Sequence, residues 1–413
     1  MQDTELYRHL LGIAAPWSVT RVALEVEKQR VDVFVEHSDT SWPCPDCGKE
    51  LSVYDHGEQR QWRHLDSCQF MTYLNARPPR VKCPEHGVKQ AKLPWAEPRS
   101  RFTAMFERLA IDVLLQTDIA GATRILRISW DEAWHILRRS VARGRRAKSK
   151  QVTTHIGIDE KAFAKGHRYL TLVCDLKAAT VEFIAEHRRW ESLASYFHSL
   201  DSEQLAGFEA IATDMWDPFI KAIRLNVPDW KQKLVFDRFH VMRQVGDAVD
   251  LIRRQEHREL RKRGEETLTG SKYLWLYGKE RLSSSQRREF RDLRNAKLKT
   301  ARAWAIKESL RDLWGYSTRR GAERHWKRWF GWAVRCRLKP MVEAARTLKN
   351  YLDGILTYFE HRITNAVSEG INSKIQTIKK RAYGFRNPEN FKTAIFFHCG
   401  GLQLYPGTHS KPG

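Results

Sequence analysis

The sequence predicts an α/β core that is interrupted by a long all-α insertion and preceded by a small β-rich module and a short helical region. Two observations lead to this prediction. Residues 155–245 alternate between short apolar strands and amphipathic helices, whereas residues 246–357 are helix-rich and basic. Ahead of both, two pairs of candidate metal ligands flank a segment with the alternation of β-strands.

Length and charge limit the classes of protein that fit. At 413 residues the chain is too long for one ordinary core, so about two to four domains are expected. The formal net charge is +23, and residues 251–350 alone hold 28 Lys and Arg against 11 Asp and Glu. This density favours nucleic acid as a polyanionic partner; a merely solvated basic surface and a membrane-surface role are the alternatives.

The sequence also indicates a compartment. It contains no run of about 18 apolar residues, so we expect no transmembrane helix and no membrane partner. The start, "MQDTELYRHLLGIAAPW", has acidic residues where a signal peptide needs basic ones. We therefore expect a cytoplasmic protein. In that reducing compartment the seven cysteines are metal ligands or inert thiols rather than disulfides.

Two short motifs predict a zinc site. "CPDCGKE" supplies Cys44 and Cys47, and "CPEHG" supplies Cys83 and His86, each pair with a turn-forming Pro and a following Gly. Two such knuckles make a closed, tetrahedral Cys₃His site for one structural Zn²⁺. Cys68 and His64 lie between the knuckles and could replace a ligand. The segment "QWRHLDSCQFMTYLNARPPRVKC" is predicted to form two strands.

A helical region follows the knuckles. From Phe102 to about Gln116 the apolar residues follow helical spacing. A second, short helix is predicted to begin with Thr117 as its N-cap and to end at a turn near residues 127–128.

The next helix carries a clear start signal. Ser129 and Glu132 form an S-x-x-E capping box. The helix that they open carries Arg138 and Arg139, and the run "ARGRRAKSKQ" at 142–151 is interpreted as a linker. Two short helices, a tight turn and a basic tail resemble a helix-turn-helix, although helical hairpins that bind no DNA are common.

After this region the hydrophobic period changes to that of strands. "THIGIDEKAF" predicts a short strand ending in Asp159, two further strands follow, and "FEAIATDMW" predicts a strand ending in Asp214. The predicted order is β-β-β-α-β-α-β-α, which is that of an RNase H-like core with helices on a mixed sheet. In that topology the first and fourth strands are neighbours, so Asp159 and Asp214 should lie close together.

Carboxylates at neighbouring strand ends suit hard divalent cations. Mg²⁺ prefers carboxylate oxygens, and two such ions promote phosphoryl transfer. A third carboxylate from a helix would complete the set, and Glu369 is the candidate. An isolated Asp at a strand end is otherwise a turn or N-cap residue, and the roles of Asp237 and His240 stay open.

Glu369 lies in "NAVSEGINSKIQTIKKRAYGFRN", residues 365–387, as a lone carboxylate among cationic and amide side chains. Apolar residues at intervals of four, four and three predict a helix with one apolar stripe. These residues are Val367, Ile371, Ile375 and Ile378. Glu369 falls on the opposite face, where the alternative interpretation is a solvated side chain near a helix start.

Together these motifs resemble the ISL3 family of bacterial insertion-sequence transposases, which belongs to the DDE superfamily. The resemblance covers nearly the whole chain, from the zinc knuckles through the helix-turn-helix, "GIDE" and "TDMW" to "SEGINSKIQTIKKRAYGFRN", which is the most specific motif. It implies a catalytic, metal-binding triad of Asp159, Asp214 and Glu369. It also implies a helical insertion between Asp214 and Glu369, which are 155 positions apart. That insertion contains Trp275, Trp304, Trp314, Trp326, Trp329 and Trp332.

The resemblance implies a DNA transposase that binds terminal inverted repeats and catalyses Mg-dependent DNA strand cleavage and strand transfer. It would use two Mg²⁺ (or Mn²⁺) ions per active site, act on element ends and target DNA as a homodimer in the synaptic complex, and be associated with the bacterial nucleoid. The residues expected to contact DNA are Arg138, Arg139, Asn372, Lys374, Lys379, Lys380, Arg381 and Arg386.

Two other functions fit the same motifs. One is a catalytically inactive, sequence-specific DNA-binding repressor, and the other is an RNase H-like structure-specific nuclease. The expected domains are a zinc module at 1–98, a helix-turn-helix region and linker at 99–150, the first part of the core at 151–245, the insertion at 246–357 and the completion of the core at 358–413.

Overall fold

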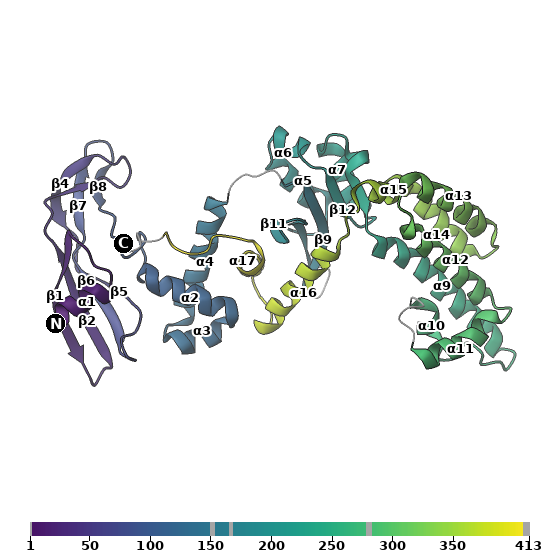
Figure 1. The fold of residues 1–413 in the computed structure, drawn as a ribbon, viewed down its shortest axis with the longest axis horizontal. Coiled ribbons are helices and arrows are strands. Elements are labelled where there is room, and N and C mark those ends of the chain that lie inside the picture. Colours follow the sequence, from purple (N-terminus) through teal and green to yellow (C-terminus); the bar gives the residue numbers. More distant parts are fainter. Residues whose placement is uncertain (1, 149–152, 165–167, 278–282, 408–413) are drawn as a thin grey trace. The chain divides into compact units, whose positions relative to one another are not determined.

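The computed structural model describes residues 2–148, 153–164, 168–277 and 283–407 (Figure 1). The chain forms two compact units. The first comprises Met1–Lys148, Phe396–His398 and Leu402–Gly413, and the second comprises Ser149–Ile395 and Cys399–Gly401.

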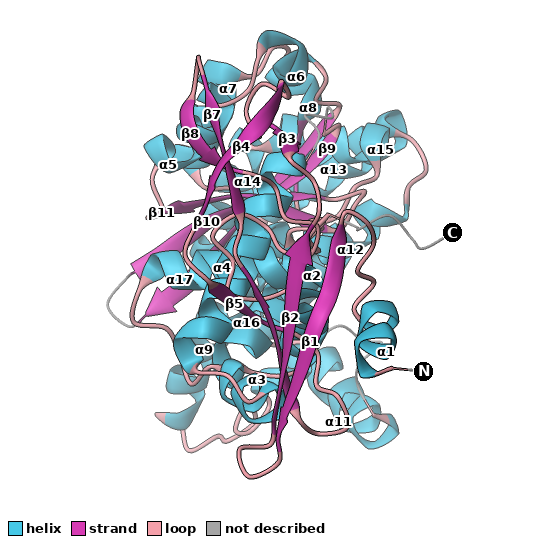
Figure 2. Ribbon diagram, turned by 90° about the vertical axis from the view of Figure 1, so that its left-hand side faces the viewer, coloured by secondary structure: helices cyan, strands magenta, loops and turns pink. Residues whose placement is uncertain are grey.

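The first unit begins with a β-rich module. After helix α1 (Asp3–Leu10), its strands are β1 (Trp17–Glu25), β2 (Arg30–His37), β3 (Ser41–Pro43), β4 (Glu50–His56), β5 (Arg60–Arg63), β6 (Met71–Ala76), β7 (Pro79–Cys83) and β8 (Gly87–Gln90). They form two four-stranded sheets with the orders β1-β2-β6-β5 and β3-β4-β7-β8. The antiparallel strands β1 and β2 run side by side (Figures 1 and 2). Buried Trp17, Trp62 and Trp95 meet edge to face in the core of the first sheet.

The prediction of two strands between the knuckles is wrong in number. The predicted segment contains β5, β6 and β7. Strands β6 and β7 are separated at Pro78, and they join different sheets. A proline lacks the N–H that a continuous ladder requires, so it favours a break at this point.

Three helices complete the first unit: α2 (Ala104–Gln116), α3 (Ile119–Leu126) and α4 (Trp130–Ala147). The predicted capping box of Ser129 and Glu132 opens α4, and Arg127 makes the turn before it with a φ of 55°. The predicted N-cap of α3 is wrong by one residue. Asp118 caps the helix, since its carboxylate accepts a backbone hydrogen bond from the first turn, and Thr117 ends α2 instead.

The predicted linker is also too long. Helix α4 continues to Ala147, while residues 149–152 lie outside the described residues. The C-terminal segment stabilises this last part of α4. A Cβ on Gly144 would come within 2.7 Å of the Leu402 side chain, Arg143 donates to the carbonyl of Leu404, and the Tyr405 hydroxyl donates to Asp112 at 2.6 Å.

A five-stranded mixed sheet forms the centre of the second unit. Its strands are β9 (His155–Ala164), β10 (Arg168–Asp175), β11 (Thr180–Glu186), β12 (Ala210–Thr213) and β13 (Leu234–Phe236), in the order β11-β10-β9-β12-β13. Strands β9, β10 and β11 are antiparallel, whereas β12 is parallel to both β9 and β13. Helices α5 (Trp190–His198), α6 (Ser202–Ala206), α7 (Asp217–Asn226) and α8 (Trp230–Lys233) connect the later strands. The predicted order of strands and helices is confirmed, with the added short helices α6 and α8.

The described residues between 238 and 361 form helices that are joined by loops. The helices are α9 (Arg238–Arg261), α10 (Lys272–Leu276), α11 (Ser284–Asn295), α12 (Lys299–Arg311), the 3₁₀ turn η2 (Asp312–Gly315), α13 (Arg319–Arg335), α14 (Lys339–Asn350) and α15 (Leu352–His361). Most of the tryptophans that the sequence placed here belong to the core: Trp275, Trp304, Trp326 and Trp329 are buried, Trp314 is partly buried and Trp332 is exposed. Their main role is therefore packing.

Two helices end the fold, α16 (Ala366–Arg381) and α17 (Pro388–Cys399). Helix α16 lies beside β9 (Figure 1). The predicted apolar stripe faces the protein, because Ile371 and Ile375 are buried and Val367 and Ile378 are partly buried. Glu369 is exposed in the first turn.

Candidate functional site

The two strand-end carboxylates lie at one level of the sheet. Strands β9 and β12 pair in parallel with Gly157 opposite Ala212, so Asp159 and Asp214 follow the last paired residues by two positions each. The prediction that the strand ends at Asp159 is wrong, because β9 continues to Ala164 in its antiparallel ladder with β10. Only the parallel pairing stops before Asp159, and this still places the two carboxyl groups together.

Both carboxyl groups are mostly buried, and burial raises the pKa of each above its ordinary value. The nearby charge of Asp214 raises the pKa of Asp159 further, as does that of Asp237, whereas His240 lowers it. Asp237 directly follows β13, and its carboxylate caps α9 by accepting the amide of Phe239 at 2.8 Å. The structure thus places Asp237 and His240, whose roles the sequence left open, in the electrostatic surroundings of Asp159.

An arginine that the sequence did not single out orients Asp214. Arg188 donates to Asp214 Oδ2 at 3.2 Å, forms an ion pair with Glu160 and lies over the Trp216 ring at 4.0 Å. The other oxygen, Asp214 Oδ1, is buried without a hydrogen-bond partner. Arg188 therefore holds one carboxylate oxygen of Asp214, whereas the other oxygen makes no hydrogen bond, which is unusual for a buried polar atom.

Helix α16 contacts this group of side chains through Asn372. Its amide donates to Asp159 Oδ2 at 2.7 Å, and Lys161 donates to its carbonyl at 3.0 Å. Glu369 lies three residues before Asn372, about one turn earlier on the same side of α16. Among the described residues, the three predicted triad carboxylates do not form a compact group, since ligand atoms of three or more residues approach within 4.8 Å of one another only at the N-terminal cysteines.

A glycine allows α16 to approach β9 this closely. A Cβ on Gly157 would lie 2.9 Å from Asn365 Oδ1 and 2.7 Å from the Leu176 side chain, and closer still to Ser368 Oγ. Asn365 and Ser368 are buried at the start of α16. The glycine two residues before Asp159 therefore sets the distance between the strand and the helix that carries Glu369.

The predicted DNA-contacting residues fall into two groups. Five side chains are exposed: Arg138, Lys374, Lys380, Arg381 and Arg386. The other three are Asn372, Arg139, which is paired with Glu97 at 3.1 Å, and Lys379, which donates to the carbonyl of Ala162 at 3.3 Å. Arg139, Lys379 and Asn372 therefore bond to other parts of the protein. The sequence pattern alone did not distinguish exposed cationic residues from those with partners inside the protein.

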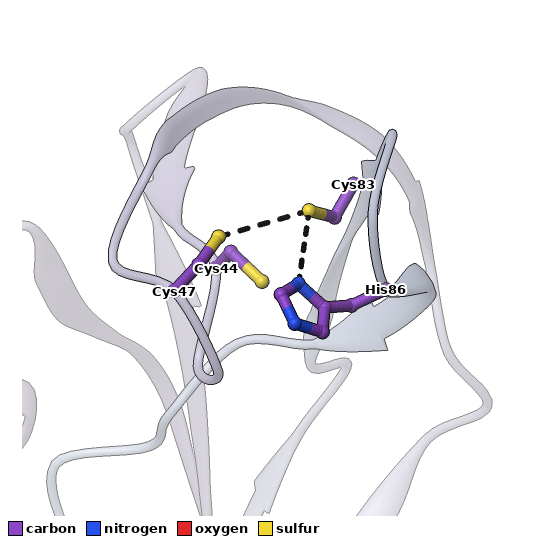
Figure 3. Close-up of side chains that lie close together, drawn as sticks. All are labelled: Cys44, Cys47, Cys83 and His86. Carbon is purple, nitrogen blue, oxygen red and sulfur yellow. Dashed lines mark hydrogen bonds between the residues drawn. The ribbon is translucent and has the colours of Figure 1, made fainter.

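The zinc ligands predicted from the sequence converge. The ligand atoms of Cys44, Cys47, Cys83 and His86 all lie within 4.8 Å of one another (Figure 3). Cys47 Sγ and Cys83 Sγ are 3.8 Å apart. Zinc with Zn–S bonds of about 2.3 Å separates its tetrahedral sulfurs by roughly the same distance.

The chemistry of these donors also fits zinc. A hydrogen bond with His86, 3.4 Å from Sγ to Nδ1, lowers the pKa of Cys83 to about 6, which favours the thiolate that binds metal. The two alternative ligands lie elsewhere. His64 is buried and bonds to Thr103 Oγ1 at 2.9 Å, and Cys68 is exposed outside the cluster.

Among the described helices, none is long and apolar enough to cross a membrane.

Comparisons with known proteins agree with this arrangement. Residues 156–395 match the family model DDE_Tnp_ISL3, described as a transposase. Residues 40–86 match a zinc-finger of transposase IS204/IS1001/IS1096/IS1165, and residues 91–141 match the helix-turn-helix domain of transposase family ISL3. The chain is 27% identical over 443 residues to the transposase for insertion sequence element IS1557 of Mycobacterium tuberculosis, covering 100% of this chain and 99% of the relative. It is 25% identical over 396 residues to the transposase for IS1001 of Bordetella parapertussis, covering 95% and 97%.

Proposed function

This chain belongs to the ISL3 family of transposases, and we propose that it cleaves and joins DNA at an active site built from Asp159, Asp214 and Glu369. The observation that carries this assignment is the pair of buried carboxyl groups at neighbouring strand ends, beside the helix that carries Glu369. Together with the family membership, this pair favours an enzyme over an inactive repressor.

The arrangement of the second unit supports an RNase H-like core. Its sheet has three antiparallel strands followed by two parallel ones, and helices α9 to α15 lie between β13 and α16. We infer that residues 151–245 and 358–413 form the core and that 246–357 form an insertion. Residues 1–98 then form the zinc module, and 99–150 form the helix-turn-helix region and linker.

The acidic residues fit two Mg²⁺ or Mn²⁺ ions. Oxygen ligands suit these cations, and the buried Asp214 Oδ1 has no hydrogen-bond partner among the described residues. Asp159 and Asp214 would hold the ions, and Glu369 would contribute from α16. When bound, such ions stabilise the negative charge that develops on the attacking and leaving oxygens of a phosphoryl transfer.

The side chains of the chain itself prepare the site. Asn372 fixes the orientation of Asp159, and Arg188 fixes that of Asp214. In the first reaction, water attacks a phosphodiester at the element end, and the P–O3′ bond breaks to leave a 3′-OH. In the second, this 3′-OH attacks a target phosphodiester in line, and the target P–O3′ bond breaks. Positioning and charge provide most of such catalysis.

DNA recognition would be divided among several surfaces. The helix-turn-helix and the zinc module would bind the terminal inverted repeats, Arg138 among the contacting residues. Lys374, Lys380, Arg381 and Arg386 would hold phosphates along α16. Because two element ends have to be brought together, we propose a homodimer in the synaptic complex, acting at the bacterial nucleoid in the cytoplasm.

The test of the proposed function uses a supercoiled plasmid that carries the flanking terminal repeats, incubated with Mg²⁺. The wild-type protein should release element ends and join them to target DNA. Glu369→Gln should reduce both reactions by at least about 10²-fold, since a metal ligand contributes several kcal/mol to transition-state stabilisation. Glu343→Gln, which changes an exposed glutamate on α14, is the matched control and should behave as wild type. Binding without cutting by the wild type would refute the proposal, and cutting without joining would favour a nuclease.

A second test concerns the contact between β9 and α16. Gly157→Ala should displace α16 from Asp159 and reduce DNA cleavage by roughly 10²-fold, because a shift of about 1 Å in a catalytic group has this effect. Gly246→Ala in α9, where a Cβ meets nothing within 4 Å, should leave cleavage unchanged. Equal activity of both variants would show that the close approach is not required.

A further inference from the structure

Tyr383 stands out on the surface next to α16. Its side chain is 98% exposed, whereas the next most exposed large apolar side chain among the described residues, Val26, reaches 64%. A phenol ring that is exposed to water does not gain the favourable free energy that burial of its apolar area would provide. Such exposure in a folded unit points to a partner that covers the ring.

The backbone holds the ring outward. Tyr383 has a left-handed φ of 51°, and Gly384 follows with a φ of 98°. The amides of both residues donate back to α16, at 3.0 Å to the carbonyl of Lys380 and at 2.9 Å to that of Lys379. A left-handed conformation is costly for a tyrosine, so this turn needs support from the surrounding structure.

That support comes from the next aromatic residue. Phe385 packs on Phe391 with ring centroids 4.9 Å apart, and Phe391, which is fully buried, packs on Phe163 of β9 at 5.7 Å. The turn is therefore anchored on its inner side by Phe385, while Tyr383 is directed away from the core.

The charge around the ring identifies the kind of partner. Lys380, Arg381 and Arg386 are exposed on either side of Tyr383 in the sequence, and the intervening residues carry no acidic side chain. An aromatic ring between cations matches a nucleic-acid strand, since cations contact phosphates and the ring contacts a base.

We propose that Tyr383 stacks on an unpaired base of the DNA bound along α16. The faces of paired bases are hidden inside the duplex, so a side chain that offers a flat ring needs an unpaired or extruded base. From Glu369 to Arg381, where α16 ends, the helix extends roughly 18 Å at 1.5 Å per residue, so a base on Tyr383 lies away from the reacting phosphodiester. Tyr383 is thus a DNA-binding residue that selects opened DNA, and the inference rests on the proposed binding of DNA by α16.

The experiment uses the full chain with Asp159→Asn, so that bound DNA stays intact. The probes are a forked duplex with 2-aminopurine in one unpaired arm and a fully paired duplex with the same top strand. The parent protein and Tyr383→Trp should bind the forked probe about 10-fold more tightly than the paired probe and quench the 2-aminopurine emission. Tyr383→Asn should bind both probes equally without quenching. Asparagine adopts left-handed φ readily, so the turn should persist and the loss would report on the ring alone.

The control is Tyr273→Asn, which removes an exposed tyrosine from α10 and should keep the preference for the forked probe. A preference retained by Tyr383→Asn would overturn the inference. The inference would also be overturned if Tyr383→Asn changed the mass of the DNA-free protein in light scattering but kept the preference for the forked probe. That result would assign the ring to a contact with a second copy of the chain. Cleavage is measured separately with the aspartate intact, so failure of the catalytic proposal is distinguishable from failure of this one.

Discussion

Removal of zinc is expected to unfold the end of the N-terminal module that the two knuckles hold together. Apparent binding free energies of about 10–16 kcal/mol are typical of structural zinc in small modules, and much of this energy is folding energy. Strands β3, β4, β7 and β8 form a sheet with little apolar core of its own, since most of the buried aromatic residues of the module belong to the other sheet. Without the ion, these strands should lose protection from protease, and binding to the terminal repeats should fall by about 10²-fold or more.

The measurement combines metal analysis with limited proteolysis of the full chain. Wild-type protein should contain one zinc ion per chain, and Cys83→Ser should contain none. Cys68→Ser is the matched control, because Cys68 is an exposed cysteine between the knuckles but outside the cluster. Zinc retained by Cys83→Ser, or lost from Cys68→Ser, would contradict the ligand set.

The sequence predicted those features whose cause is local. Cysteine knuckles show their spacing directly, because each pair must place two ligands on one turn. The capping box of Ser129 and Glu132 is equally local, since both hydrogen bonds lie within one helical turn. Alternating apolar residues located the strands of the core, and with them the level at which Asp159 and Asp214 meet.

Features that depend on distant partners were not predictable in this way. Arg188 and Arg189 are adjacent and identical in the sequence, yet only the folded chain brings Arg188 to Asp214 and Glu160. Arg139 was predicted to contact DNA, but it pairs with Glu97 inside the protein. Glu97 precedes it by 42 positions, so the local sequence does not reveal this partner. The extra length of β9 depends on its ladder with β10, which the apolar pattern after Asp159 does not reveal.

Asp159→Asn is expected to abolish cleavage and joining, by at least about 10³-fold, while leaving DNA binding intact. The substitution keeps the size of the side chain and its acceptor for the Glu160 amide, which lies 2.7 Å from the carboxylate. What it removes is a charge that a divalent cation needs, and the loss of several kcal/mol of transition-state stabilisation follows. Asp247→Asn, on the exposed side of α9, is the matched control and should retain activity.

The thermal stability of Asp159→Asn should show whether Asp159 binds a catalytic metal ion or has only a structural role. In the metal-free protein, burial and the charges of Asp214 and Asp237 raise the pKa of Asp159, so the folded state binds its proton more tightly than the unfolded state. Wild-type stability should therefore fall as pH rises from the ordinary carboxyl pKa through this raised value, and Asp159→Asn should unfold at an equal or higher temperature at neutral pH. Added Mg²⁺ should reverse the order, stabilising the wild type by about 2.7 kcal/mol at a hundred times the dissociation constant and leaving the variant unchanged. Equal stabilisation of both proteins by Mg²⁺ in thermal unfolding would mean that Asp159 holds no ion, and its carboxylate would then be a structural acceptor for Asn372.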